Sequence, residues 1–305
     1  LNIGAGARAL GMGGSFVAIA NDATTAYWNP AGLGNIKNTE IAFMHTQMFG
    51  LDNYDFVNCV QPISKTGALG LSWIRLGIDD IPITELSKPG DMSASNRPVI
   101  AGYMQDTENA FIFSYGKRIK SPNEITDFDV NIGGSAKFIY NSVSVINRNA
   151  IGFGGDLGLF CKKSLLTDRD EDKKAFISFG ATAQDFFKTR IIWNTTSSPS
   201  HMDIIQPNIK IGIAYSQFIS RISSMMTFTM DANTRYGLEM NYGIEYNFGN
   251  LLSIRTGIQD NNFTDGAGLN IAFARGDSEL SFLVDYAFLS HELGNIHRIS
   301  AMTKF

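Results

Sequence analysis

The sequence predicts an all-β fold, a transmembrane antiparallel β-barrel of about 14 strands with an N-terminal plug (hatch) of short helices and turns in its lumen. Three features indicate this fold. Apolar and polar residues alternate along most of the chain, the alternating segments are long, and the connections between them are alternately short and long. We expect the plug over residues 1–38 and the barrel over residues 39–305.

Alternation with a period of two is typical of strands whose two faces meet different surroundings. It is clearest over residues 237–248, where one face carries Leu238, Met240, Tyr242, Ile244, Tyr246 and Phe248. The opposite face of the same segment is polar or glycine. Residues 279–288 repeat the pattern. After residue 40 no comparable stretch of sequence has a helical period, so we expect strands throughout.

Turn signals divide this region into strands that begin near residues 39, 53, 67, 108, 127, 150, 173, 207, 222, 237, 250, 264, 278 and 294. Most have about 9 to 13 residues, close to the length that crosses a bilayer at a tilt. Several aromatic residues fall near strand ends, where rings favour the headgroup boundary: Tyr140, Tyr215, Tyr246, Phe248 and Phe305.

The connections alternate in length. One end, which we call upper, has long segments over residues 78–107 and 186–206. The other end has tight turns at 63–66, 249–250 and 276–277, with 162–174 as a longer exception. This asymmetry is typical of outer-membrane barrels. The alternative is a secreted β-sandwich or propeller whose apolar face forms its core, and that fold would not require it.

Composition excludes other classes of protein. Of the 305 residues, 44% are hydrophobic and 18% charged, and the formal net charge is -4. Disordered chains combine low hydrophobicity with high net charge, and nucleic-acid-binding proteins cluster Lys and Arg. A helical membrane protein needs runs of about 18 apolar residues, but the sequence has none and its mean hydropathy is -0.04. We therefore expect no nucleic-acid partner.

The sequence also gives no indication of an enzyme. Cys59 and Cys161 are too far apart in sequence for a metal-binding pair, and we expect free thiols, no metal and no cofactor. The histidines are scattered, and no nucleophile elbow or zinc-protease motif occurs. A run that imitates a calcium loop lacks its glycine and final glutamate, so we interpret it as a solvated turn: Asp168, Asp170 and Asp172.

The first 38 residues do not alternate and are rich in glycine. Gly4-x-Gly6-x-x-Ala9 imitates a dinucleotide-binding motif, but the βαβ context that this motif needs is missing. Small residues instead favour a compact plug whose backbone approaches the barrel wall closely. We expect a helical turn over residues 15–20 and a tight turn over residues 29–32.

Arg8 is the single cation of the early plug, and burying it is costly unless an acid pairs with it. Acids on the lumen phase of the strands are its candidate partners, and the sequence leaves the choice among them open: Asp156, Glu239, Glu245 and Asp285.

Residues 6–33 resemble the N-terminal signature of the PorV/PorQ family, which is related to the FadL-type outer-membrane transporters. The resemblance is carried by the Gly-Met-Gly-Gly stretch, the Asn-Asp-Ala stretch and the Asn-Pro-Ala-Gly stretch of this region. We expect the plug to depend on Arg8, Met12, Gly13, Gly14, Asp22, Asn29, Pro30, Ala31 and Gly32. Asn21 stands where Asp is common, which removes one possible charge partner for Arg8.

The resemblance to PorV implies a non-catalytic barrel of type IX secretion or a related surface assembly. Its partners would be outer-membrane lipid and a secretion translocon or secreted cargo protein. Apolar residues of the long upper segments are the candidate protein-binding surface: Ile81, Ile83, Leu86, Phe187, Ile191, Ile192 and Trp193. The alternative to protein binding is that these segments fold over the barrel mouth and pack on one another.

The resemblance to FadL implies the alternative, a transporter of long-chain fatty acids or other hydrophobic molecules, with fatty acid or detergent in the lumen. We place Val57, Cys59, Ile139 and Leu283 on the lumen phase, but most of that phase is polar. A hydrated or plugged lumen is therefore expected. The chain begins without Met, and we expect the outer membrane of a Gram-negative (diderm) bacterium after removal of a signal peptide.

Overall fold

The computed structural model describes residues 3–120, 128–145, 148–165, 174–194, 201–275 and 278–305. The acidic run Asp168, Asp170 and Asp172 lies outside them. The described chain forms one antiparallel sheet of sixteen strands, of which all but β8 and β9 make a closed ring of fourteen. The ring closes because β1 pairs with β16 and β5 pairs with β6. The expected fourteen-stranded barrel is confirmed.

The barrel strands begin within two residues of the positions that the turn signals predict, except the strand expected near residue 108, which begins at Pro98. The strands are β1 (Glu40–Met48), β2 (Asp52–Ser64), β3 (Gly67–Leu86), β4 (Pro98–Lys120), β5 (Phe128–Val143), β6 (Arg148–Ser164), β7 (Ala175–Gln184), β8 (Thr189–Trp193), β9 (Met202–Ile205), β10 (Asn208–Ile219), β11 (Ser224–Asn233), β12 (Glu239–Phe248), β13 (Leu252–Gln259), β14 (Asn262–Arg275), β15 (Ser278–Leu289) and β16 (Ile296–Lys304). We call the end of the barrel where β1 begins and β16 ends the lower end, and the opposite end the upper end.

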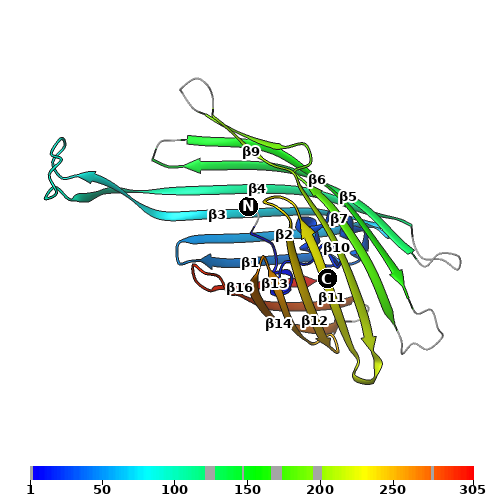
Figure 1. The fold of residues 1–305 in the computed structure, drawn as a ribbon. Helices are drawn as coiled ribbons and strands as arrows, with labels where there is room; N and C mark the ends of the chain where they lie inside the picture. The colour runs from blue at the N-terminus through cyan, green and yellow to red at the C-terminus, as the bar shows by residue number, and fades with distance from the viewer. Residues whose placement is uncertain (1–2, 121–127, 146–147, 166–173, 195–200, 276–277) are drawn as a thin grey trace.

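The first long upper segment is mostly strand and not a loop. β3 continues to Leu86 and β4 starts at Pro98, so the two strands leave the barrel as a twisted ribbon (Figure 1). The pairing shifts register between Ile78 and Ile81 and again after Ile83. These irregularities interrupt the two-residue period, which is why the sequence pattern loses the strands there.

The second long upper segment also contains strands. β8 continues β7 beyond a bulge over residues 185–188 and pairs with β6, while β9 pairs with β8. Asp185 and Lys188 have φ values of 53° and 61°. Because these two non-glycine residues have left-handed backbone conformations, the chain leaves the sheet at Asp185 and returns to it after Lys188. Residues 185–188 therefore lie outside the regular strand pairing.

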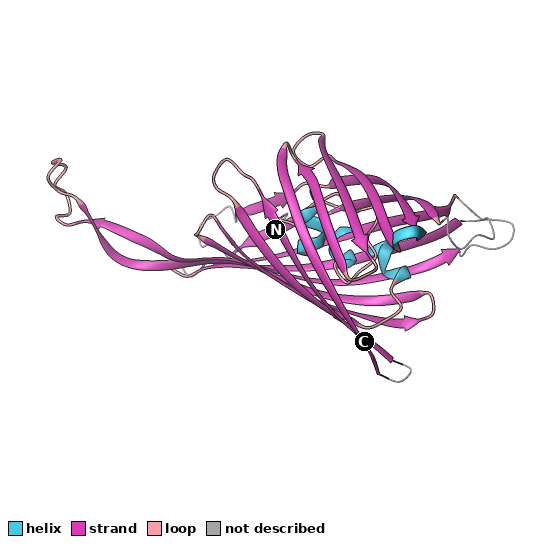
Figure 2. Ribbon diagram, turned by 90° about the horizontal axis from the view of Figure 1, so that it is seen from below, coloured by secondary structure: helices cyan, strands magenta, loops and turns pink. Residues whose placement is uncertain are grey.

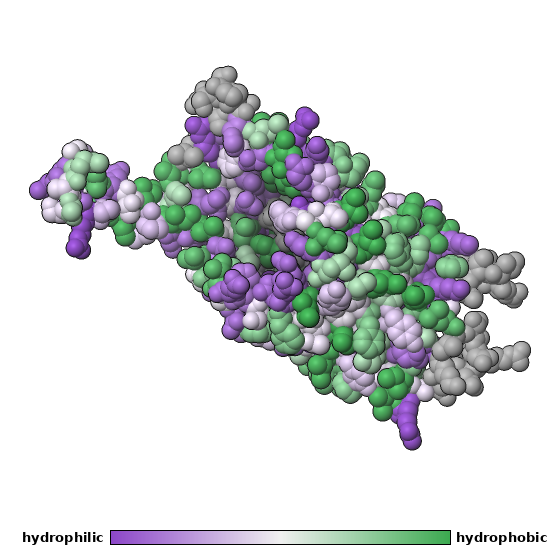
Figure 3. All heavy atoms as spheres, viewed as in Figure 1, coloured by the Kyte–Doolittle hydropathy of each residue, from purple (hydrophilic) through white to green (hydrophobic). Residues whose placement is uncertain are grey.

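The outward phase of the strands is apolar along the wall, and Figure 3 shows these side chains gathered over the barrel. The expected phase of β2 is wrong. Its inward residues are Tyr54, Phe56 and Val60, whereas Val57 and Cys59 face outward. The outward face of β2 includes Asn53 and Asp55, whereas its inward face packs on the plug, with the Phe56 ring 6.5 Å from that of Tyr27, so polarity did not indicate which face is which.

The N-terminal segment lies inside the ring (Figure 2). It contains α1 (Ala7–Gly11), α2 (Thr25–Trp28) and the 3₁₀ helix η1 (Pro30–Asn35). None of the described helices is long and apolar enough to cross a membrane. α1 contacts β13 to β16, and η1 contacts β3 to β6. A Cβ on the wall residue Gly133 would overlap the Pro30 carbonyl, so glycine permits this close approach.

No helix is assigned over residues 15–20, but the expected turn is present, because the Ile19 N–H donates to the Phe16 carbonyl at 3.2 Å. The backbone N–H groups of Phe16 and Val17 donate to Asp231 Oδ2 of the wall, at 2.7 and 2.8 Å. A wall carboxylate thus accepts hydrogen bonds from N–H groups at the start of this turn, which have no acceptor within the turn itself. The expected tight turn over residues 29–32 becomes the start of η1, with Pro30 at its first position.

Candidate functional site

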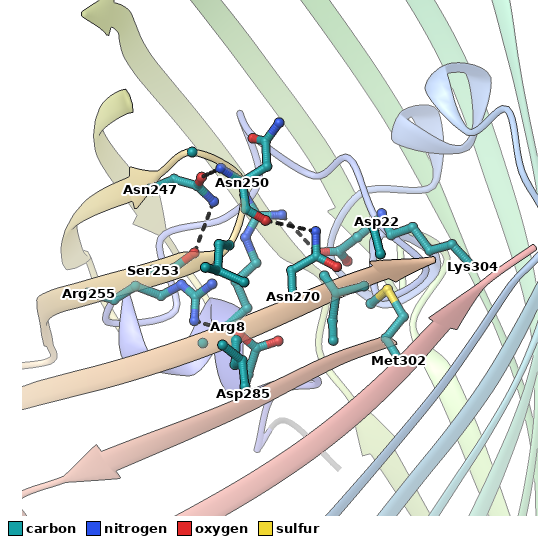
Figure 4. Close-up of a pocket in the computed structure, with 16 residues that line it drawn as sticks. Arg8, Asp22, Asn247, Asn250, Ser253, Arg255, Asn270, Asp285, Met302 and Lys304 are labelled. Carbon is teal, nitrogen blue, oxygen red and sulfur yellow. Dashed lines mark hydrogen bonds and ion pairs between the residues drawn. The ribbon is translucent and has the colours of Figure 1, made fainter. Parts of the chain in front are cut away.

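A chain of ion pairs joins the plug to the wall at the lower side of the plug. Arg8 binds Asp22 Oδ2 through Nη1 at 2.9 Å and Glu245 Oε1 through Nη2 at 2.8 Å. Glu245 also accepts from Arg255 Nε at 2.7 Å, and Arg255 Nη1 contacts Asp285 Oδ1 at 2.6 Å (Figure 4). We call these five residues the ionic ladder. It links the plug to β12, β13 and β15.

The structure settles which acid pairs with Arg8. Of the four candidates, Glu245 is the direct partner in the wall, and Asp285 takes part through Arg255. Asn21 also binds Arg8, because its Oδ1 accepts a hydrogen bond from Arg8 Nη1 at 2.7 Å. Burial alone lowers the pKa of Arg8, but the carboxylates of Glu245 and Asp22 raise it above its ordinary value. The guanidinium therefore stays charged.

The other residues of the predicted plug motif meet inside the ring. Asn29 caps η1 through Oδ1, which accepts from the Ala31 N–H at 3.1 Å. Its Nδ2 donates to the carbonyls of Val17 and Leu159, so one side chain ties two plug segments to β6. Met12 is fully buried, and Gly13 and Gly14 have positive φ values that favour glycine.

A cavity of about 160 Å³ lies on the upper side of the plug. We call it the upper cavity. Its apolar side is made by Tyr27 of the plug and by wall residues of β3, β4, β5 and β9: Ile74, Ala110, Ile112, Ile139 and Ile205. Burial raises the pKa of Tyr27 to about 12, so its phenol is neutral at physiological pH. This apolar side is a local exception to the expected polar lumen.

The opposite side of the upper cavity carries charges that pair with one another. Lys137 Nζ lies 2.7 Å from Asp156 Oδ1 and 3.0 Å from Asp185 Oδ1, and Arg235 Nη2 lies 2.6 Å from Asp185 Oδ2. Two cations and two carboxylates therefore neutralise each other. A second cavity of about 180 Å³ adjoins this one and shares Tyr27 and Tyr236 with it.

Two cavities lie on the lower side of the plug, with volumes of about 520 and 380 Å³. Arg8, Asn247 and Asn250 line both. Figure 4 shows Arg8, Asp22, Arg255 and Asp285 of the ionic ladder and several amide side chains around the larger one. Glu245 lines the smaller one. Within the described part of the chain, the upper and lower cavities have no lining residue in common. The plug segment separates them.

The structure does not bring the predicted protein-binding residues together. Ile81, Ile83 and Leu86 lie in the β3 ribbon, and the other four lie in the bulge and β8, with β4, β5 and β6 between the two groups. Ile191 is buried and faces inward. Trp193 donates from Nε1 to Asp203 Oδ2 at 2.6 Å.

Phe187 and Ile192 are exposed on the outer wall, where they line a groove of about 800 Å³ between β5, β6 and β8. We call it the outer groove. Its remaining lining residues are Tyr140, Asn149, Ile151, Phe153, Lys188, Arg190, Trp193 and Asn194. Sequence reasoning missed this groove because the bulge creates it. The signal that could have indicated it is two adjacent aromatic residues followed by two cations in one segment.

Comparison with known proteins supports the fold and leaves the family open. Residues 1–81 match the profile of a family described as an uncharacterised protein family (UPF0164). No curated protein matches the chain by sequence. The structure is similar to that of the CymD monoaromatic hydrocarbon channel, with a TM-score of 0.50, 11% identity, and 99% and 97% of the two chains covered. It is also similar to the structure of a Pseudomonas aeruginosa FadL homologue, with a TM-score of 0.51, 9% identity, and 96% of each chain covered. The chain thus has the fold of FadL-type outer-membrane barrels.

Proposed function

We propose that this protein is a non-catalytic outer-membrane barrel that binds small hydrophobic molecules above its plug and passes them across the membrane. The observation that carries the proposal is the upper cavity, whose apolar wall faces a plug that separates it from the lower cavities. Solved structures of the same fold include a monoaromatic hydrocarbon channel and a FadL homologue, which supports this interpretation.

The chemistry of the upper cavity favours a ligand without charge. Ile112 and Ile139 are almost fully buried and project inward from β4 and β5. A hydrocarbon that fills the cavity packs against these apolar side chains and displaces water that finds no hydrogen-bond partner on them. The charges opposite are already paired within the protein, so they offer no free partner to an ionised headgroup.

Outer-membrane location and the role of the plug belong to the same proposal. The apolar band on the outer wall suits lipid, and the long ribbon of β3 and β4 suits the outer surface of the cell. We assign the upper end to the exterior and residues 1–38 to a plug that blocks free diffusion of water-soluble solutes.

The PorV-like alternative is supported by one observation, the projecting ribbon. It carries exposed apolar side chains on two strands, among them Leu86, Ile100 and Tyr103. Exposed apolar patches of this kind are typical of protein contacts. Co-purification from native membranes distinguishes the two functions, since a secretion barrel retains cargo or translocon proteins and a hydrophobic-molecule carrier does not.

Ligand binding tests the main proposal directly. Ile139→Asn places an amide in the apolar wall and should weaken binding of naphthalene at least tenfold in lipid nanodiscs, as measured by its fluorescence. Ile139→Leu keeps the apolar volume and should bind as the wild type does. Equal affinity of Ile139→Asn and wild type would contradict the proposal.

A further inference from the structure

The outer groove has a composition that differs from the rest of the outer wall. Its lining is apolar and aromatic on one side, with Phe153, Phe187 and Ile192 more than half exposed. Lys188 and Arg190 line the same groove, and no acidic residue lines it. The groove is therefore a local positive site on a chain whose formal net charge is -4.

The two cations have no partner in the part of the chain that the structure describes. Neither side chain takes part in an ion pair there, although the acids Asp156, Asp185 and Asp203 lie on neighbouring segments. Asp156 and Asp185 face inward to the upper cavity, and Asp203 binds His201 and Trp193. A cation on the lipid-facing wall is unfavourable unless it lies near the headgroups or meets an anion.

The surroundings place these cations at headgroup depth. Arg190 pairs with Phe153 in the ladder between β6 and β8. Phe153 ends a series of ring contacts on the outer wall, 5.4 Å from Phe138, which lies 6.3 Å from Phe111. Aromatic girdles of this kind mark the boundary between acyl chains and headgroups in outer-membrane barrels.

The bulge of residues 185–188 builds the groove. Its positive-φ residues lift Phe187 and Lys188 out of the sheet. Gly155 of β6 lies underneath, where a Cβ would stand 2.9 Å from the Phe187 ring. A larger residue there would push the ring away, so glycine at this position keeps the apolar floor continuous.

The geometry points to a binding site for an anionic phospholipid in the outer groove. One acyl chain lies along Phe153, Phe187 and Ile192, and the phosphate is bound by Lys188 and Arg190. The volume of about 800 Å³ is within the range of specific ligand pockets. Guanidinium and ammonium groups together suit a phosphate, which accepts several hydrogen bonds. This site does not depend on the transport proposed above, since it lies on the outer wall.

Native mass spectrometry of the full chain tests the site. The probes are phosphatidylglycerol and phosphatidylcholine with identical acyl chains. The wild type should retain phosphatidylglycerol preferentially, and the double variant Lys188→Gln, Arg190→Gln should lose about thirtyfold of that preference, since each cation near an anionic surface contributes about fivefold. The control variant Lys117→Gln, Arg221→Gln removes two exposed cations near the lower end and should keep it. Absence of a preference in the wild type, or an equal loss in the control, would overturn the proposal.

A second measurement distinguishes lipid from a simple anion. Ile192→Ser removes apolar surface from the groove and should weaken the binding of long-chain phosphatidylglycerol severalfold. The control Ile209→Ser changes a similarly exposed outer residue of β10 and should leave that binding unchanged. Glycerol phosphate should compete poorly. Competition by glycerol phosphate at the affinity of the lipid would show an anion site without lipid recognition and would refute the proposal. Loss of naphthalene binding in these variants is not expected, so this test and that of the proposed function fail independently.

Discussion

The two sides of the plug differ in how they use charge. On the upper side, the charges pair among wall residues and leave an apolar surface around Tyr27. On the lower side, the ionic ladder runs from the plug into the wall, and Arg8 remains partly exposed to the larger cavities. Arg8 is the most exposed of the paired residues on either side, with 21% of its side chain exposed, so its desolvation is less unfavourable than that of the other ions. The comparison shows one side arranged for an apolar ligand and the other for holding the plug.

Removing the plug should give the largest effect. A chain without residues 1–38 should insert as a barrel and conduct small solutes, because both cavity systems then merge. Planar-bilayer conductance measures this, with the intact chain as control. Conductance equal to that of the intact chain would show that residues 1–38 do not close the lumen, and the contrast between the two sides would lose its basis.

Breaking the ionic ladder should give the next largest effect. Arg8→Met leaves the buried carboxylate of Asp22 without its cation, while Glu245 keeps Arg255, so we expect a cost of about 3 kcal/mol, at the low end of the range for a buried pair that loses one partner. The plug should open more often, seen as frequent brief conductance events and faster hydrogen exchange over residues 7–22. Arg221→Met removes an exposed cation and serves as the control. A closed, silent Arg8→Met channel would show that the ladder does not hold the plug.

Neutralising one carboxylate of the upper side should change selectivity more than closure. Asp185→Asn leaves Lys137 and Arg235 with one carboxylate fewer. The upper cavity then gains net positive charge, so we expect a long-chain carboxylate to gain affinity relative to naphthalene by about tenfold, near 1.4 kcal/mol. Competition binding measures the ratio. If the ratio is unchanged, the paired charges do not set the preference for uncharged ligands.

The smallest effect is expected at Asn21. Asn21→Ala removes one neutral acceptor from Arg8 while both carboxylates stay, and such a hydrogen bond contributes about 1 kcal/mol. The rate of plug opening should rise less in Asn21→Ala than in Arg8→Met. Asn21→Asp should slow opening, because a third carboxylate would then face Arg8. Faster opening in Asn21→Asp would indicate that repulsion among the three acids exceeds their attraction to Arg8.

Much of the barrel could be predicted because the membrane imposes a simple rule on each strand. One face meets lipid and the other meets water or protein, so alternation alone locates β12, β13 and β15 and their phase. The rule failed at β2, whose inner face packs on the plug and is more apolar than its outer face. It also failed at the β3 ribbon and at the bulge after β7, where extra residues interrupt the period.

The sequence by itself determined the approximate number of barrel strands and the apolar outer wall, because both depend on local periodicity. Only the tertiary structure decided that Arg8 binds Glu245, that Asp185 pairs with Lys137, and that Arg190 lies beside Phe153 on the outer wall. These contacts join residues far apart in sequence. Strand register and the bulge fix them, and neither is set by the composition of any one segment.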